Sequence, residues 1–345
     1  MIESLEQLVE ANKRILVFGA GGGGDALGAV HLYIKLSNLG AEPLLGSIVW
    51  ERFILDPHPG PIPIEALIGA ERIGWSLALV NGNTKAIRFG RELKPQVVRI
   101  AGALGIEALY IDASKGGEGV LQALRDAIDK LGVEAVIGLD TGGDIIARGC
   151  EEDLWSPLAD AMSLYALASI DRPSLIALLS PGADGELPMD TVLRYISAIA
   201  SRGGLIGVYG LTRSEYRYMR ELSKHTISEA SLIPLRAFEG EHGEALIRGK
   251  TRRVAINPVS AATFILDPKV IYEWTPLGKA VKNTRSVKDA SRALNEMCIY
   301  TELDLEEDLS QLSGSTLNEP RSILEIRSLG RQRIIRRGCN PVSCP

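Results

Sequence analysis

Ile15-Leu16-Val17-Phe18-Gly19-Ala20-Gly21-Gly22-Gly23-Gly24-Asp25 joins a short apolar run to a turn of glycines, and an apolar-periodic segment follows as far as Gly40. This order predicts a strand, a tight turn and a helix. Glycines leave the backbone N–H groups of such a turn unobstructed, and a helix that begins near Asp25 directs its positive end at the same place. The segment therefore predicts a site for a phosphate or another anion.

Six further apolar runs have the length and composition of strands, and helical periods separate them. They cover residues 44–49, 77–80, 108–111, 135–139, 175–179 and 205–209. Strands that alternate with helices are typical of a parallel sheet covered on both faces. We predict an α/β chain with a Rossmann-like, doubly wound, mostly parallel sheet, helices on both faces and a smaller C-terminal extension.

The alternation weakens beyond about Thr212, which divides the chain into three parts. We predict a Rossmann-like ligand-binding core over 1–211, a C-terminal α/β part packed on that core over 212–300, and an acidic-then-basic tail over 301–345. The run SILEIRSLGRQRIIRRG in the tail favours a hairpin that turns near Leu329 and Gly330. Its arginines either form a solvated face or pair with the acidic segment before them.

Composition narrows the class of protein. The 345 residues carry a formal charge of −5, with 46% hydrophobic and 23% charged residues, which is ordinary for a soluble enzyme. An apolar run of membrane-spanning length and a signal peptide are both missing, so we expect a cytoplasmic protein without a membrane partner. The chain has no overall basic field, so we do not expect a nucleic-acid partner. A homo-oligomer remains open.

Two minor compositional features leave alternatives open. The chain has four cysteines, of which Cys339 and Cys344 lie close together at its end. They form a disulfide with each other, half of a zinc site, or a tail without function. Glutamine is scarce, with five residues, and depletion of thermolabile amides indicates a thermophilic source.

Read strictly, Gly19, Gly21 and Gly24 satisfy GxGxxG, the fingerprint of dinucleotide binding when a strand precedes it and a helix follows. In that fingerprint an acidic residue at the end of the second strand binds ribose. Glu51 occupies about this place, with Arg52 beside it. The glycines alternatively do no more than permit a tight turn and close helix packing.

Three more turns that combine glycine with an acidic residue follow predicted strands. They are Asp140-Thr141-Gly142-Gly143-Asp144, Asp112-Ala113-Ser114-Lys115-Gly116-Gly117 and Ser180-Pro181-Gly182-Ala183-Asp184-Gly185-Glu186. The carboxyl ends of parallel strands lie at one edge of a sheet, where open α/β proteins bind ligands. We therefore expect these turns beside the first one, although Asp and Gly are also common in turns without any function.

Carboxylates this numerous would repel a phosphate in the predicted anion site, so we expect a cation or a group that carries hydroxyls between them. Mg²⁺ held by Asp140 and Asp144 is the simplest one, and sugar hydroxyls are the second. We predict Asp140, Asp144, Lys115 and His58 as catalytic residues: an aspartate as general base, Lys115 opposite negative charge and His58 as an acid or base. The ligand-binding set is predicted to be Gly19, Gly21, Gly22, Gly23, Gly24, Asp25, Glu51, Asp112, Thr141, Gly142 and Gly143.

The segments GAGGGGDALGA, LDTGGDIIARG and SPLADAMSL carry a resemblance to a known family. The chain resembles the archaeal family catalogued as domain of unknown function (DUF) 1152, to about residue 300. The resemblance implies a Rossmann-like fold and no defined substrate. The first glycine turn is also similar to the first nucleotide loop of the tubulin and cell-division GTPases, but Asp144 replaces the glycines expected in their later phosphate loop.

We expect the chain to bind a nucleotide or another phosphorylated, hydroxyl-bearing small molecule, as an enzyme that Mg²⁺ assists. An NAD(P)-dependent oxidoreductase that uses the GxGxxG turn is one alternative. A nucleotide-sensing or assembly protein without turnover is another. The P-loop motif GxxxxGK[ST] is absent, which argues against an ordinary P-loop ATPase.

Overall fold

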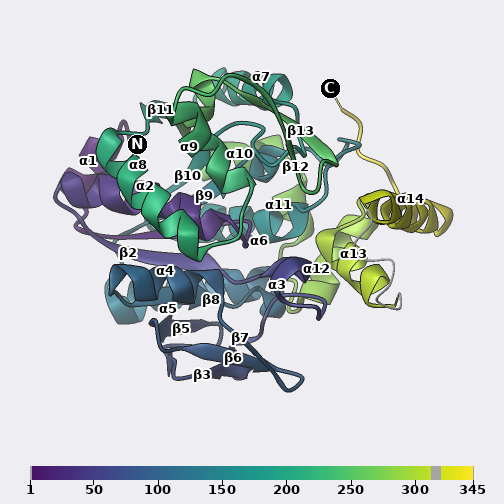
Figure 1. Cartoon of the computed structure of the whole chain (residues 1–345), viewed down its shortest axis with the longest axis horizontal. Helices are drawn as coiled ribbons and strands as arrows, with labels where there is room; N and C mark the ends of the chain where they lie inside the picture. The colour runs from purple at the N-terminus through teal and green to yellow at the C-terminus, as the bar shows by residue number, and fades with distance from the viewer. Residues whose placement is uncertain (1, 312–319, 345) are drawn as a thin grey trace.

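A computed structural model describes residues 2–311 and 320–344 of the chain, and it centres on a nine-stranded sheet (Figure 1). The order of the strands across this sheet is β11-β14-β10-β9-β1-β2-β8-β5-β4. In chain order the strands are β1 Arg14–Gly19, β2 Glu42–Ile48, β4 Glu71–Arg72, β5 Leu77–Val80, β8 Ala108–Ile111, β9 Ala135–Thr141, β10 Ser174–Leu179, β11 Leu205–Gly210 and β14 Ala262–Leu266. All seven strands predicted from the apolar runs are confirmed.

The five central strands, β10-β9-β1-β2-β8, are all parallel. The chain moves outward from β1 to β2 and β8, then returns to the other side of β1 for β9 and β10. This reversal places a topological switch point between β1 and β9, where open α/β sheets bind ligands. The predicted doubly wound, mostly parallel sheet is therefore confirmed, with antiparallel strands only towards its edges.

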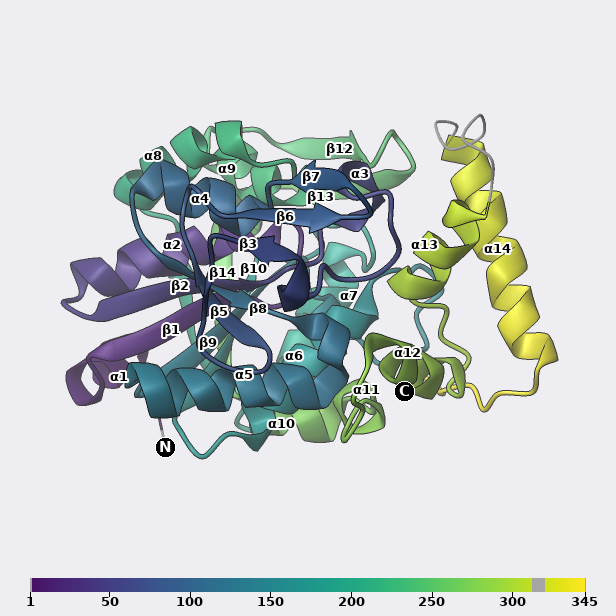
Figure 2. The same cartoon turned by 90° about the horizontal axis from the view of Figure 1, so that it is seen from below.

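Helices cover both faces of the sheet (Figure 2). They are α1 Leu5–Ala11, α2 Asp25–Asn38, α3 Arg52–Leu55, α4 Gln96–Leu104, α5 Gly116–Leu131, α6 Pro157–Ser169, α7 Met189–Ala200, α8 Arg213–Leu222, α9 Ile233–Phe238, α10 Pro268–Trp274, α11 Leu277–Ala280, α12 Val287–Asn295, α13 Glu302–Ser310 and α14 Pro320–Arg336. Alternation along β1 divides the core: Leu16 and Phe18 pack towards α5 and α6, whereas Ile15 and Val17 pack towards α2.

Two small sheets lie outside the central one. One consists of β3 Leu67–Ile68, β6 Lys85–Arg88 and β7 Arg91–Leu93, and the other is the hairpin of β12 Gly243–Ile247 and β13 Arg252–Ile256. The central sheet crosses the predicted boundary at residue 212, because β14 lies between β10 and β11. The second part of the chain thus completes the sheet of the first.

No described helix is long and apolar enough to cross a membrane.

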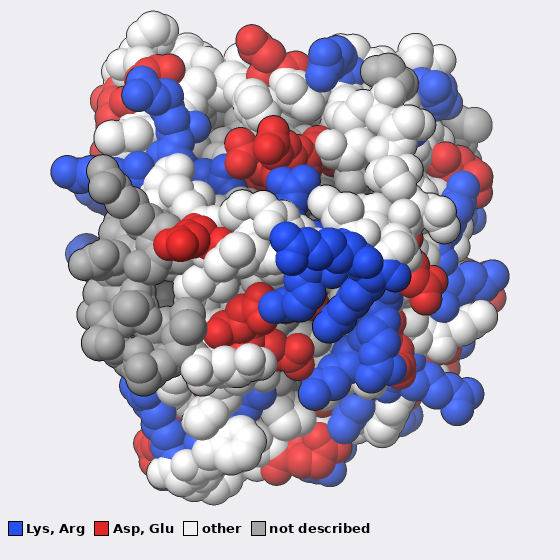
Figure 3. Space-filling view, turned by 90° about the vertical axis from the view of Figure 1, so that its right-hand side faces the viewer, with Lys and Arg blue, Asp and Glu red and all other residues white. Residues whose placement is uncertain are grey.

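The predicted hairpin in the tail is wrong, because the helix α14 runs through Leu329 and Gly330. Arg327 and Ile334 are buried on one face of this helix, and Gly330 between them approaches Tyr300 so closely that a Cβ would lie 2.1 Å from the ring. Arg327, Gly330 and Ile334 are spaced by three and four residues, which fits one face of a helix. The prediction of a hairpin did not take this spacing into account. Arg333 pairs with Asp308 at 2.8 Å, which confirms the pairing alternative for this arginine. Figure 3 shows basic side chains gathered on this side of the molecule.

Of the three alternatives for Cys339 and Cys344, the disulfide between them is wrong. Cys344 is bonded to Cys150 and Cys339 to Cys298. Their partners come from segments 194 and 41 residues away, which spacing within the tail did not indicate. Both thiols are therefore engaged, which also removes the zinc half-site, and the tail is attached at two points.

Candidate functional site

A cavity of about 490 Å³ opens at the carboxyl ends of β1 and β9, at the switch point. Its walls come from the turns after β1, β9 and β10, from α6, from the segment before α9, from the β12–β13 hairpin and from α13 and α14. The lining residues are Gly21, Gly22, Gly23, Gly24, Asp25, Arg52, Phe53, Asp140, Thr141, Asp144, Trp155, Ser156, Asp160, Asp184, Ile227, Ser228, Glu229, Ala230, Ser231, Arg248, Gly249, Thr251, Glu302, Leu305, Glu306, Leu309 and Ile323.

The glycine turn forms one wall of this cavity. Gly22 and Gly23 have φ angles of 80° and 55°, which favour glycine over residues with a Cβ. Gly23 N–H donates to the Trp50 carbonyl at 3.1 Å. Among the residues that the structure describes, the amides of Gly22 and Gly24 meet no protein acceptor. Gly24 also caps the N-terminus of α2, so these two donors coincide with the positive end of the helix dipole.

Asp25 connects the first turn to the second. Its Oδ2 accepts the N–H of Gly21 at 2.7 Å and its Oδ1 accepts the N–H of Thr141 at 3.0 Å. Burial raises the pKa of Asp25 to about 7, although both hydrogen bonds favour the charged form. The carboxylate therefore orders the two turns while lying at the cavity wall.

A first carboxylate cluster consists of Asp25, Asp140 and Asp160, whose nearest oxygens all lie within 4.8 Å of one another. All three side chains are buried. Burial, and then the neighbouring carboxylates, raise the pKa values of Asp140 and Asp160 well above the usual range. Asp140 Oδ2 and Asp160 Oδ1 have no hydrogen-bond partner among the described residues. Such oxygens require a proton, a cation or a ligand group.

A second carboxylate cluster consists of Asp144, Asp184 and Glu186. Arg248 Nη1 lies 2.9 Å from Glu186 Oε1, and the backbone N–H groups of Trp155 and Ser156 donate to Glu186 Oε2. Although burial opposes it, the Arg248 guanidinium holds the pKa of Glu186 below its ordinary value. This cluster therefore has its own countercharge.

Ser156 belongs to the second cluster rather than to the cap of α6. It precedes the helix as predicted, but its hydroxyl does not bond the first turn of the helix. The hydroxyl instead donates to Glu186 and lies 3.3 Å from Asp144 Oδ2. Burial and the nearby carboxylates Asp160 and Asp140 raise the pKa of Asp144.

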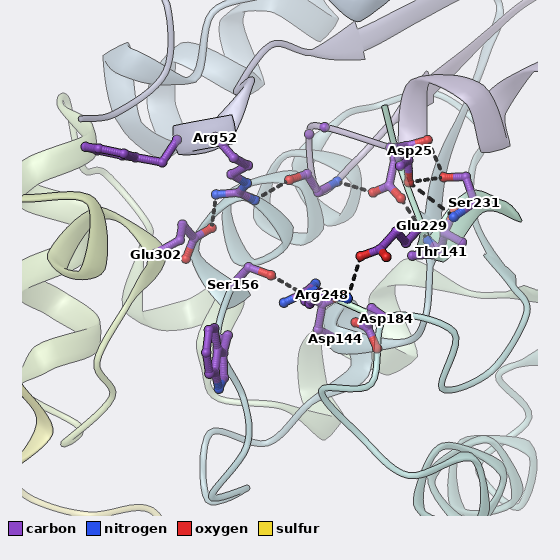
Figure 4. A pocket seen from close by; sticks show the side chains of 18 of the residues that line it. Asp25, Arg52, Thr141, Asp144, Ser156, Asp184, Glu229, Ser231, Arg248 and Glu302 are labelled. Atoms are coloured by element: carbon purple, nitrogen blue, oxygen red, sulfur yellow. Dashed lines mark hydrogen bonds and ion pairs between the residues drawn. The ribbon is translucent and has the colours of Figure 1, made fainter. Parts of the chain in front are cut away.

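Arg52 closes the opposite end of the cavity (Figure 4). Its Nη2 donates to the Gly21 carbonyl at 2.7 Å, its Nη1 lies 3.2 Å from Glu302 Oε1, and its guanidinium lies over the Trp50 ring at 4.5 Å. Its φ of 58° is unusual for a residue with a side chain. The arginine thus fastens the glycine turn to α13.

Two further contacts hold the walls to the turn. Glu306, one helical turn after Glu302, accepts the indole N–H of Trp50 at 2.9 Å and the N–H of Gly60 at 2.8 Å. On the other side, the Ser231 hydroxyl donates to the Gly24 carbonyl at 2.7 Å. The cavity is therefore shaped by hydrogen bonds from three separate parts of the chain.

The structure brings many of the sequence-predicted residues together. Gly21 to Gly24, Asp25, Asp140, Thr141 and Asp144 line the cavity. Gly19, Gly142 and Gly143 lie in the same turns without lining it. A Cβ on Gly142 would lie 2.4 Å from the Asp184 carboxyl carbon, so this glycine permits a close approach between two of the turns.

Other predicted residues lie elsewhere. Asp112 accepts the backbone N–H groups of Ser114 and Ile64, and Lys115 pairs with Glu65 at 2.7 Å. Their turn follows β8, which is two strands away from β1.

Glu51 and His58 also lie outside this cavity. Glu51 is buried and accepts the N–H of Gln96 at 2.8 Å. His58 packs on Phe89 and lines a separate cavity beside the proline-rich loop.

Several lining residues were not predicted as site residues. Asp160 is the one charged residue in the mainly apolar run 157–169, and a charge inside a buried helix is a signal that the sequence did offer. The sequence places Asp184 in a turn but predicts no role for it. It predicts Glu302 and Glu306 only as part of an acidic tail, although their spacing of four residues places both on one helix face. Nothing in the local sequence distinguishes Arg248.

A family model described as "Protein of unknown function (DUF1152)" matches residues 16–310. The curated proteins gave no match. The solved structures gave none either. The matched range contains the glycine turn, both carboxylate clusters and α13.

Proposed function

The chain belongs to the DUF1152 family, and we propose that it binds a nucleotide or another phosphorylated, hydroxyl-bearing small molecule at the carboxyl edge of its sheet, as an enzyme assisted by Mg²⁺. One observation carries the proposal. Gly22 and Gly24, whose amides meet no acceptor among the described residues, line the same cavity as Asp140 and Asp160, each of which has a carboxylate oxygen with no partner in that part of the chain.

The glycine turn supports a phosphate end of the ligand. The Gly22 and Gly24 amides and the N-terminus of α2 offer donors where negative charge is favoured. Arg52 lines the cavity beside them and is held in place by Glu302. Guanidinium groups suit phosphate because their donors match its oxygens.

The carboxylates support a hydroxyl-bearing part of the ligand and a cation. Ionised carboxylates accept hydrogen bonds only, so they suit sugar hydroxyls and hard cations and repel a bare phosphate. A cavity of about 490 Å³ falls within the usual range for small-molecule sites. Bound Mg²⁺ would neutralise this charge and polarise a phosphoryl oxygen.

We leave the bond that is made or broken in this proposal unspecified.

The oxidoreductase alternative receives less support from the geometry. Nicotinamide dinucleotides need an acidic side chain at the ribose, and the residue predicted for this task was Glu51. Glu51 does not line the cavity and is engaged by the Gln96 amide. Arg52, its predicted neighbour at the ribose, instead binds Glu302 and the glycine turn.

Thermal unfolding with matched ligand pairs tests the proposal. We expect one phosphorylated compound from a panel of nucleotides and sugar phosphates, given with Mg²⁺, to raise the melting temperature, as selective binding to the folded state requires. The corresponding nucleoside or free sugar should give a much smaller shift. Equal shifts for both members of every pair, or no shift across the panel, would refute the phosphate site. Recovery of the ligand unaltered would favour a sensing role over an enzyme.

A further inference from the structure

The first carboxylate cluster concentrates acidic groups without a basic partner. Asp25, Asp140 and Asp160 come from the start of α2, the end of β9 and the first turns of α6, and each is at least nine-tenths buried. Among the described residues, no Lys, Arg or His forms an ion pair with any of them. Arg52, which lines the same cavity, is engaged by Glu302 and the Gly21 carbonyl. Three buried carboxyl groups therefore share a space in which the described chain gives none of them an ion-pair partner, and Arg52 acts on Asp25 and Asp160 only from a distance.

The unpartnered oxygens give a second and separate indication. Asp140 and Asp160 are each only 1% exposed. Their oxygens Asp140 Oδ2 and Asp160 Oδ1 are buried and meet no hydrogen-bond donor of the described chain. Buried carboxylate oxygens without a partner are costly, since they lose the hydration of the unfolded state. A bound group that accepts their lone pairs removes this cost.

The glycine turn leaves room for two carboxylates of the cluster, those of Asp25 and Asp160. A Cβ at Gly21 would lie 2.7 Å from Asp25 Oδ2 and 2.7 Å from Asp160 Oδ2, so the two carboxylates converge on the space beside this glycine. Asp25 is held there by the Gly21 and Thr141 amides. Each of its oxygens retains a second lone pair for another partner.

The second carboxylate cluster differs in this respect. Glu186 receives Arg248, the Ser156 hydroxyl and two backbone amides. Its neighbour Asp184 accepts the Glu186 N–H at 3.0 Å. Figure 4 shows Arg248 beside Asp144 and Asp184, with Asp25 and Thr141 farther along the cavity. A cation would gain less in a cluster that already contains a guanidinium.

We infer that Asp25, Asp140 and Asp160 hold one divalent cation of the Mg²⁺ or Mn²⁺ type between the glycine turn and α6, and that the second cluster does not. This assignment replaces the pair Asp140 and Asp144 expected from the sequence, because Asp144 lies in the second cluster. Carboxylate oxygens are the ligands that such cations prefer. The coordination positions that the three carboxylates do not fill would be available to water and to a phosphate oxygen of the ligand. The inference rests on the proposed function, because it assigns a position to the cation of that function. Binding of the metal alone, without a phosphorylated compound, is enough to test it.

The experiment measures Mn²⁺ binding to the EDTA-treated full chain, without any phosphorylated compound, by the loss of the free-ion signal in electron paramagnetic resonance. We expect one Mn²⁺ per chain, displaced by Mg²⁺. Asp140→Asn and Asp160→Asn should each weaken binding by roughly 100-fold or more, because each removes a direct ligand. The two variants change different elements, so misfolding of one leaves the other as the test.

Asp184→Asn is the matched control, since it removes a buried carboxylate of the second cluster at the wall of the same cavity. It should leave the Mn²⁺ affinity within about threefold. Loss of binding in Asp184→Asn with retention in Asp140→Asn and Asp160→Asn would overturn the assignment, as would no bound Mn²⁺ in the unchanged chain. Mn²⁺ binding without any phosphate-dependent thermal shift would instead contradict the proposed function and leave the cation site standing.

Discussion

Asp25 accepts the backbone N–H of Thr141 at 3.0 Å, across a sequence separation of 116 residues. The carboxylate at the start of α2 therefore fixes the turn after β9. Since β1 and β9 are neighbours at the switch point, one side chain orders both turns that border the cavity. Asp140, at the end of β9, has an oxygen that no hydrogen-bond donor reaches in the described part of the chain. The two aspartates thus differ in what they contribute to folding.

This difference predicts opposite effects on stability in the absence of metal. Asp25→Asn replaces an acceptor oxygen by an NH₂ group, which faces an N–H donor and costs about 1–3 kcal/mol. Asp140→Asn replaces a carboxyl group whose ionisation is opposed by burial and by the neighbouring carboxylates, and it should leave the free energy of unfolding unchanged or higher. Urea denaturation at neutral pH after EDTA treatment measures both. A large loss of stability in Asp140→Asn would show that its carboxylate has a structural partner.

The glycine turn gives a second prediction with a matched control. Gly22 and Gly40 have similar φ angles of 80° and 90°, so alanine at either position costs roughly 1–2 kcal/mol of backbone strain. A Cβ at Gly22 would lie 3.1 Å from the Trp50 Cβ, whereas one at Gly40 meets nothing within 4 Å. Gly22→Ala should therefore abolish the phosphate-dependent thermal shift, and Gly40→Ala should keep it. Retention of the full shift in Gly22→Ala would place the phosphate elsewhere.

Arg52 and Glu302 give a third prediction, about the attachment of α13. Arg52→Met leaves the buried Glu302 carboxylate without its cation and frees the Gly21 carbonyl, with an expected cost of about 1–3 kcal/mol. Adding Glu302→Gln should restore part of this loss, because the unpaired charge is then gone. Denaturant unfolding of the two single variants and the double variant measures the coupling. Strict additivity would mean that the pair contributes nothing to stability.

Much of the fold was predictable because the seven strands expected from the sequence contain short apolar runs, with turn signals and helical periods between them. The helix 116–131 ends at Gly132, which adopts the left-handed conformation expected of a C-terminal cap. The structure of the tail was harder to predict from the sequence. Its helix buries Arg327 and Ile334 against distant segments, and contacts of this kind cannot be inferred from the local pattern of apolar and polar residues.

The site was predictable to the extent that it follows strand ends. The turns after β1 and β9 meet in the structure as expected, whereas the turn with Asp112 follows a strand that lies two places away. Asp160 projects from a helix, and Arg248 comes from the hairpin of β12 and β13. Which helix or hairpin covers a strand end depends on tertiary packing, so a local reading found neither.

His31 gives a fourth prediction, on pH dependence. It is buried, with Nδ1 3.1 Å from Glu215, Nε2 3.0 Å from the Thr263 hydroxyl and Lys35 bound to the same glutamate. Burial lowers the pKa of His31 below the ordinary 6.5. Below that pH His31 is protonated more readily in the unfolded chain than in the folded protein. The free energy of unfolding therefore falls as the pH decreases from about 6.5.

The variant His31→Gln should flatten this slope between about pH 6.5 and 5. His225→Gln, at an exposed histidine, is the control and should retain it. Urea midpoints measured across this range provide the comparison. An unchanged slope in His31→Gln would assign the pH dependence to other groups.

The most direct measurement is mass spectrometry of the small molecules that the purified chain retains after exposure to a cell extract with Mg²⁺. We expect a phosphorylated, hydroxyl-bearing compound in near-stoichiometric amount on the unchanged chain and on Gly40→Ala, and its loss from Gly22→Ala. A chain that retains no phosphorylated compound, or a Gly22→Ala variant that retains the same one equally well, would rule out a phosphate site at the glycine turn.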